Sequence, residues 1–173
     1  MVRDFAAWLE TTGISVKVQS ISWIIPVLQS LHILMIGIVF VSSLMITLRV
    51  VGGIRTDEPF ATVWGRFAPW MWSGLVVMAL SGLVLIIGEP VREFTAVSFW
   101  LKMSLLVVSV TSIFVFGRTL RPETLTSATA EFSAGRKAAA LATVFLWLAI
   151  IFLGRAIAYD TEVWGSWSLH PPT

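Results

Sequence analysis

The chain alternates between long apolar runs and short polar segments, and this pattern predicts four membrane-spanning helices. A helix needs about 20 apolar residues to cross a hydrocarbon core of about 30 Å. Four runs meet this length, at residues 22–50, 68–87, 99–117 and 138–158. The connections between them are short, so none separates one domain from another. We therefore expect an all-α fold, an integral membrane four-helix bundle that forms a single transmembrane domain over residues 1–173.

The residues before the first run predict a short helix on the membrane surface. Phe5, Trp8 and Leu9 fall on one side of segment 4–12, and Gly13 ends the pattern. The segment has no apolar core followed by a small-residue cleavage site, so we expect no removable signal peptide and assign insertion to the first span. A second brief interfacial helix is expected within 127–137, in the third connection.

Composition supports the membrane class and excludes several cofactors. Of the 173 residues, 57% are hydrophobic and 13% are charged, whereas about 25% are charged in a soluble domain. The sequence has no cysteine, which excludes disulfides, thiolate-bound iron–sulfur clusters and covalently attached c-type haem. A net charge of +2, scattered along the chain, does not predict a nucleic-acid partner.

Basic residues near the span ends are more frequent on one side of the predicted membrane. The two groups are Arg49, Arg55, Arg66, Arg118, Arg121, Arg136 and Lys137 on one side, and Arg3, Lys17, Arg92, Lys102 and Arg155 on the other. The positive-inside rule assigns the first group to the cytoplasm. For a bacterial chain, this predicts a multi-pass protein of the inner (cytoplasmic) membrane with both termini in the periplasm.

Two polar residues interrupt the first span. Gln29 and His32 lie on one helix face, and His32 is about 15 Å along the helix from its start. A polar side chain is costly in lipid, so it usually faces protein, water or a cofactor. Two roles for His32 stay open, an interhelical hydrogen bond and ligation of a haem or metal. Metal transport is less favoured, because such ions need several ligands and His32 is the sole buried histidine.

A haem held by His32 would lack a second histidine ligand within the spans. The other histidine, His170, lies beyond the last span. Met35, Met78 and Met103 are candidate second axial ligands, although core packing is the favoured explanation for each of them.

Two cations, Lys102 and Arg155, lie within the predicted spans on the same membrane side as the His32 half. One reading is that both extend to lipid phosphate. The alternative is that they bind carboxylates, either Glu89 or the propionates of a haem held by His32. Tyr159, one turn after Arg155, can donate a hydrogen bond to the same anion.

Four pieces of the sequence carry a resemblance to known proteins. They are PVLQSLHILMIGIVF in the first span, FAPWMWSGLVVMALSGLVLI in the second, SFWLKMSLL in the third and GRAIAY in the fourth. Together they resemble, over residues 22–159, a group of four-helix bacterial inner-membrane proteins related to the copper-resistance D type and the haem-containing protoporphyrinogen oxidase type. The resemblance implies that His32 and Lys102 take part in haem b or porphyrin chemistry.

Three functions stand as expectations. The first is a membrane redox subunit that binds b-type haem through His32 and passes electrons. The second is a non-catalytic accessory subunit of a larger complex, in which Gln29 and His32 only tie helices together. The third is a porphyrin-oxidising membrane enzyme. The expected surroundings are the lipid bilayer and either other membrane subunits or further copies of the chain.

Overall fold

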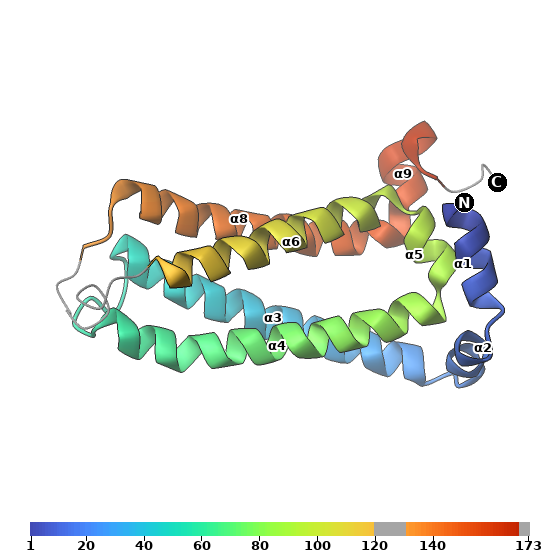
Figure 1. Ribbon diagram of the computed structural model, residues 1–173, viewed down its shortest axis with the longest axis horizontal. Helices are drawn as coiled ribbons and strands as arrows, with labels where there is room; N and C mark the ends of the chain where they lie inside the picture. Colours follow the sequence, from blue (N-terminus) through green and yellow to red (C-terminus); the bar gives the residue numbers. More distant parts are fainter. Residues whose placement is uncertain (120–130, 170–173) are drawn as a thin grey trace.

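The computed structural model describes residues 1–119 and 131–169, and four long helices dominate it (Figure 1). They are α3 (Ile24–Val51), α4 (Phe60–Gly88), α6 (Val97–Arg118) and α8 (Ala134–Ala156). All four are long and apolar enough to cross a membrane. The described residues contain no strand. The predicted all-α, multi-pass membrane bundle is therefore confirmed.

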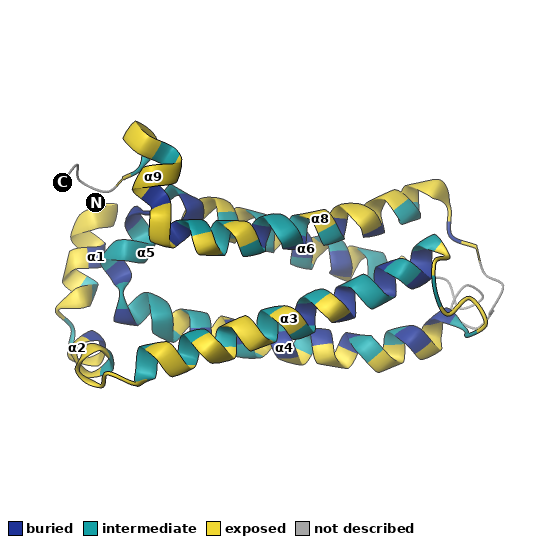
Figure 2. Cartoon of the chain, turned by 180° about the vertical axis from the view of Figure 1, so that it is seen from behind, coloured by how far each residue is buried: buried dark blue, intermediate teal, exposed yellow. Residues whose placement is uncertain are grey.

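The long helices form two antiparallel pairs. α3 packs along α4, and α6 packs along α8, while α3 also contacts α8. Direct contact between α4 and α6 is slight by comparison. The buried residues of α3 all lie at or beyond Val39, so the tightest packing is in the half of the bundle away from the N-terminus (Figure 2). We call that end, where α3 and α6 finish, the loop end, and the opposite end the α5 end.

A close backbone approach sets how α3 and α4 fit together. A Cβ atom placed on Gly74 of α4 would lie only 2.8 Å from Cγ2 of Val39 on α3. Only a residue without a side chain allows that contact, as is common where membrane helices pack closely. The Gly74–Val39 contact therefore fixes the register of the first helix pair.

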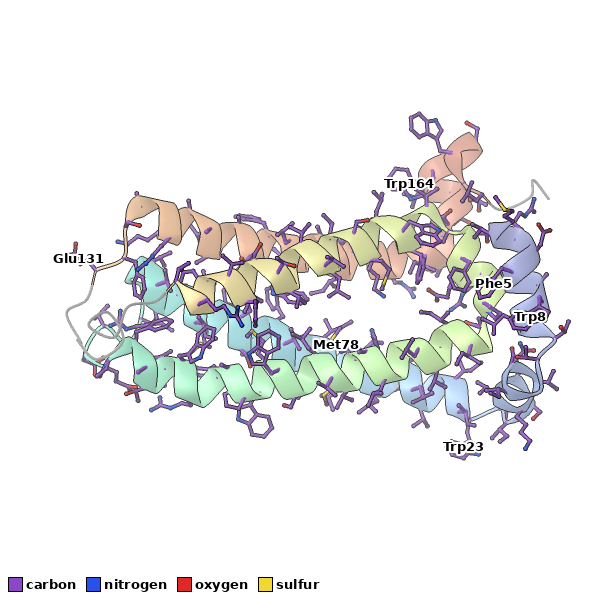
Figure 3. All side chains as sticks on the ribbon, in the orientation of Figure 1. Phe5, Trp8, Trp23, Met78, Glu131 and Trp164 are labelled. Atoms are coloured by element: carbon purple, nitrogen blue, oxygen red, sulfur yellow. The ribbon has the colours of Figure 1, made fainter. Side chains whose placement is uncertain are left out.

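Short helices cover the α5 end. They are α1 (Val2–Glu10), α2 (Gly13–Ser20), α5 (Pro90–Thr95) and α9 (Asp160–Trp164), with 3-10 turns at Ile157–Tyr159 and Gly165–Trp167. α1 lies across this end and packs on α5, where the Phe5 and Phe94 ring centroids are 5.7 Å apart. Figure 3 places Trp8, Trp23 and Trp164 at the same end, as expected for aromatic side chains at a membrane interface.

The structure moves several predicted boundaries. α4 begins at Phe60 rather than at residue 68, because two helical turns that contain Arg66 precede the uninterrupted apolar run. α8 covers residues 134–156 rather than 138–158. The N-terminal helix ends at Glu10, and Gly13 begins a second helix instead of ending the first.

The second connection contains a helix that was not predicted, and the third is only partly described by the structure. The second contains α5, which begins with Pro90 at its first turn and is too short to show a helical period in the sequence. Residues 127–130 of the interfacial helix expected at 127–137 lie outside the described residues, and from residue 134 the chain belongs to α8.

One buried carboxylate ties the C-terminal segment to α6. Asp160 is 2% exposed and accepts hydrogen bonds from the backbone N–H groups of Val97 and Ser98 at 3.2 and 3.1 Å. It also accepts from the hydroxyls of Ser98 and Ser168 at 2.9 and 2.7 Å, and Trp164 donates to the Ser98 hydroxyl at 2.7 Å. Asp160 thus supplies the acceptor that the first turn of α6 needs, where the helix dipole favours a negative charge.

Candidate functional site

The imidazole of His32 lies in the contact between the first two spans. Its Nδ1 atom is 2.8 Å from the Ser81 hydroxyl on α4. The register set by Gly74 explains this pairing, because His32 precedes Val39 by the same seven residues by which Ser81 follows Gly74. Gly82 lies beside the ring, where an added Cβ would be 3.5 Å from Cε1 of His32. The first helix pair therefore positions the imidazole, and the absence of a side chain at Gly82 leaves space beside Cε1.

The partners of Ser81 favour one tautomer of His32. The Ser81 hydroxyl lies 2.8 Å from the carbonyl oxygen of Val77 and 3.2 Å from that of Met78, and its one proton can be donated to either carbonyl. We infer that its oxygen then accepts from Nδ1–H of His32. In a neutral imidazole with this tautomer, Nε2 carries a free lone pair. His32 thus has the arrangement of an oriented ligand, with one nitrogen held by hydrogen bonding and the other available.

Lys102 approaches the same interior from the second helix pair. Its side chain lies along Gly154 of α8, where an added Cβ would be 3.8 Å from Nζ. Its charge acts electrostatically on His32. The structure therefore brings together the two residues that the family resemblance singles out, although the sequence separates them by 70 positions.

A carboxylate that the sequence reading did not single out completes this group. Glu93 of α5 is largely buried, and Lys102 and Arg92 act on it electrostatically, with 3.7 Å between Arg92 Nη2 and Glu93 Oε1. Burial raises the pKa of Glu93 above its usual range, against the opposing effect of those two cations. Glu89, the carboxylate suggested by the sequence, pairs with Arg92 instead. We refer to His32, Ser81, Lys102 and Glu93 as the His32 site.

The other predicted site residues lie at its edge or outside it. Arg155 is exposed, and its Nη2 atom donates to the Tyr159 hydroxyl at 3.1 Å while the guanidinium lies 5.1 Å from that ring's centroid. Arg155 and Tyr159 therefore pair with each other. Gln29 is partly buried one turn before His32, and the hydrogen bond to Nδ1 of His32 comes from Ser81 on the neighbouring helix.

The candidate second haem ligands have different surroundings. Met78 is in the main core at 8% exposure, and Met35 packs against that core. Met103 is exposed. His170 lies outside the described residues.

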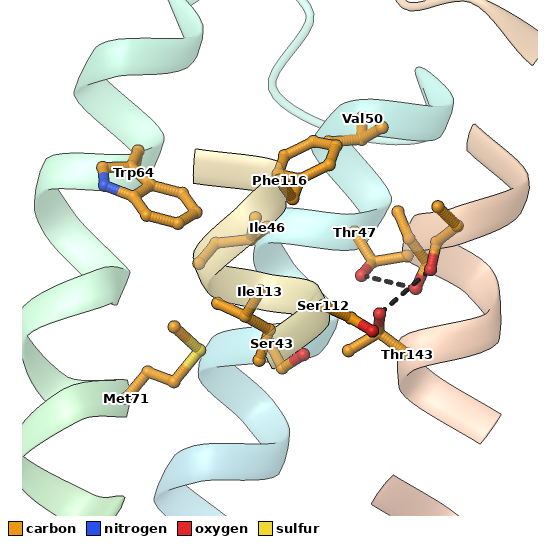
Figure 4. A pocket seen from close by; sticks show the side chains of 12 residues that line it. Ser43, Ile46, Thr47, Val50, Trp64, Met71, Ser112, Ile113, Phe116 and Thr143 are labelled. Atoms are coloured by element: carbon orange, nitrogen blue, oxygen red, sulfur yellow. Dashed lines mark hydrogen bonds between the residues drawn. The ribbon is translucent and has the colours of Figure 1, made fainter. Parts of the chain in front are cut away.

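A separate cavity of about 50 Å³ lies nearer the loop end (Figure 4). Its walls are mainly apolar. Two of the hydroxyls in them bond to backbone, since Thr47 donates to the carbonyl of Ala140 at 3.3 Å and Thr143 donates to that of Ala139 at 2.9 Å. None of the residues that line it is titratable. It has room for a water molecule but offers no acid, base or metal ligand.

Among the described residues, His32 could supply one ligand to a haem iron, and no group of side chains gathers the ligands that a bare metal ion needs. Within the described ranges, no three histidine, cysteine, aspartate or glutamate side chains come together to hold a metal. One oriented imidazole is what a haem iron takes from its proximal side, and the porphyrin supplies the other nitrogens. Lys102, whose charge acts on that imidazole, could offer the positive charge that a propionate prefers.

Comparison with known proteins gives a family and no activity. No curated protein matches the chain, and no solved structure does. A family model described as a family of unknown function matches residues 5–160, which include all four long helices and the whole His32 site. The chain therefore belongs to this family of unknown function, DUF6644.

Proposed function

We propose that this protein binds b-type haem through Nε2 of His32 and serves as a small electron-transfer subunit in the membrane. The observation that carries the proposal is the 2.8 Å hydrogen bond between Nδ1 of His32 and Ser81, because it orients the ring and leaves Nε2 free. Bound haem would supply one-electron redox chemistry. The chain itself would hold the ligand in one orientation through the Ser81 hydrogen bond and would supply the charge of Lys102, which acts on the imidazole.

Two further parts of the proposal concern location and partners. A more basic loop end supports an inner-membrane protein whose termini and α5 end face the periplasm. An electron-transfer subunit also needs a donor and an acceptor, which we assign to other membrane subunits or to further copies of the chain.

The first experiment asks whether the protein carries haem. The chain is expressed with a haem precursor, purified in mild detergent and examined for a Soret band with reducible b-type features. His32→Ala should remove the pigment while the protein still inserts, and Ser81→Ala should weaken haem affinity by roughly 10-fold to 100-fold. His170→Ala is the matched control and should keep the spectrum. Full pigment in His32→Ala would defeat the assignment.

The second experiment separates the two predicted cations by the midpoint potential. A positive charge stabilises the reduced haem, so Lys102→Gln should lower the potential by roughly 40 mV, which corresponds to about 1 kcal/mol for one electron. The sequence suggests the same effect for Arg155, but its pairing with Tyr159 on the exposed surface leads us to expect little change in Arg155→Gln. Equal shifts of the midpoint potential in Lys102→Gln and Arg155→Gln would show that Lys102 has no special place beside the haem.

An accessory subunit is the second candidate, and the His32–Ser81 bond also favours it. Such a bond between membrane helices contributes about 0.6 kcal/mol on average. A colourless protein that does not bind added haemin, in which His32→Ala only lowers thermal stability, would support this alternative. A porphyrinogen oxidation assay on the same preparation tests the third, enzymatic function.

A further inference from the structure

An open groove runs between α4 and α6 near the loop end, far along the bundle from the His32 site. Its volume is about 430 Å³, within the range of roughly 300–1,000 Å³ that small-molecule sites show. Trp64 and Trp72 of α4 form one wall, and Ile113 and Phe114 of α6 form the other. The groove exists because α4 packs on α3 and α6 packs on α8, so the two helices that border it contact each other little. Both are membrane spans, so this apolar groove opens toward lipid.

A cation sits at the end of the groove. Arg118, in the last turn of α6, lines the groove, and its Cζ lies 4.3 Å from the centroid of the Phe114 ring. Stacking uses the flat face of a guanidinium and leaves its N–H groups in the plane free to bind an anion. Arg136 lies beside this end, since its Nη2 donates to the carbonyl of Thr119 at 2.9 Å and so offsets the negative end of the α6 dipole.

The charges of the described residues differ between the two ends of the bundle. The loop end has Arg49, Arg55, Arg66, Arg118, Arg136 and Lys137 against Asp57, Glu58 and Glu131. The α5 end has Arg3, Lys17, Arg92, Lys102 and Arg155 against Asp4, Glu10, Glu89, Glu93, Asp160 and Glu162. The loop end is therefore positive and the other end is not. A positive surface at the headgroup level attracts anionic lipids.

We propose that the α4–α6 groove is a binding site for one anionic phospholipid. An acyl chain lies between the aromatic walls, and the headgroup phosphate accepts hydrogen bonds from the Arg118 guanidinium. The two halves of the site match the two halves of such a lipid, with an apolar groove for the tail and a stacked arginine at the interface for the phosphate. The site is independent of any haem at His32.

Lipid titration followed by native mass spectrometry tests the site. The detergent-purified full chain is mixed with phosphatidylglycerol or phosphatidylcholine of the same acyl chains. We expect one molecule of phosphatidylglycerol to bind in preference to phosphatidylcholine. Arg118→Gln should reduce the ratio of the two affinities by about fivefold, as expected for the loss of one interfacial cation. Ala61→Leu, which narrows the groove from an exposed position on α4, should weaken the binding of both lipids.

The matched control is Arg66→Gln, which removes the same charge from the same end of the bundle but outside the groove, where Arg66 pairs with Glu58 at 3.3 Å. Unchanged elution and melting temperature show that each variant is folded. An equal loss of lipid preference in Arg66→Gln would overturn the proposal, as would full binding in Ala61→Leu. A wild-type dimer that dissociates on Ala61→Leu would also overturn it, because the groove would then hold a second copy of the chain.

Discussion

The Asp160 carboxylate offers the sharpest test of how the C-terminal segment is held to the bundle. Asp160→Ala removes the acceptor of four hydrogen bonds at 2.7–3.2 Å, two of them from backbone N–H groups in the first turn of α6. The two serine hydroxyls can turn to other acceptors, but the two N–H groups cannot move. Loss of a helix cap costs about 1 kcal/mol, and each buried donor left unpaired costs about 1–3 kcal/mol.

The low ends of these ranges predict a loss of about 3 kcal/mol for Asp160→Ala, because the first turn of α6 is near the protein surface and water can reach part of it. For a chain of this length, 1 kcal/mol corresponds to about 2–4 °C, so the melting temperature should fall by about 6–12 °C. Asp160→Asn keeps the shape and one acceptor oxygen, so we expect roughly half that fall. Thermal unfolding in detergent can be followed by tryptophan fluorescence, because Trp164 donates to Ser98 within the same cluster.

The control for this experiment is Glu162→Gln, an exposed carboxylate two residues further along α9. It should melt within about 2 °C of the wild type, because exposed single charges contribute little. A similar fall in both variants would mean that general charge, and not the cap on α6, stabilises this end. An unchanged melting temperature in Asp160→Ala would refute the argument entirely.

Three other predictions follow from features of the bundle. Gly74→Ala should lower stability by about 1–3 kcal/mol, because its Cβ would lie 2.8 Å from Val39; an unshifted melting temperature contradicts this register. The raised pKa of Glu93 means that the folded state binds the carboxyl proton more tightly than the unfolded state does. The stability that the protonated Glu93 contributes is therefore full at low pH and is lost as pH rises through the folded pKa. Glu93→Gln should therefore flatten the dependence of melting temperature on pH, and an unaltered slope would argue against it. In this cysteine-free chain, Thr161→Cys should react with an impermeant maleimide added to intact cells and Arg55→Cys should not, and the reverse pattern would invert the proposed orientation.

Hydrophobic patterning predicts the four spans because a membrane helix must satisfy its backbone internally and face lipid with apolar side chains. It misplaces the start of α4, since the first two turns include Arg66, which pairs with Glu58 at the loop end. A charged residue there lowers the apolar signal without ending the helix. The C-terminal turns were missed for a different reason, because Asp160 holds them through long-range bonds to α6 that no local pattern records.

In the His32 site, too, some residues are visible from the local sequence pattern and others only from long-range contacts. His32 and Lys102 stand out in sequence because each places a polar group within an apolar run. Ser81 does not, since serine is common among the small residues of packed membrane helices. Its role becomes visible only with the register that Gly74 fixes, which brings Ser81 to the level of His32. Glu93 was missed because it lies on the short helix α5, in a segment that reads as a polar connection.

The pairing of α3 with α4 and of α6 with α8 has a consequence for how a large apolar molecule reaches the interior. His32 belongs to one hairpin and Lys102 to the other, and α4 and α6 share little contact. The α4–α6 side of the boundary between the hairpins is therefore held by less contact than the α3–α8 side. For the haem that we propose at His32, the α4–α6 side would offer a route from the lipid that does not pass through the water-facing ends of the protein.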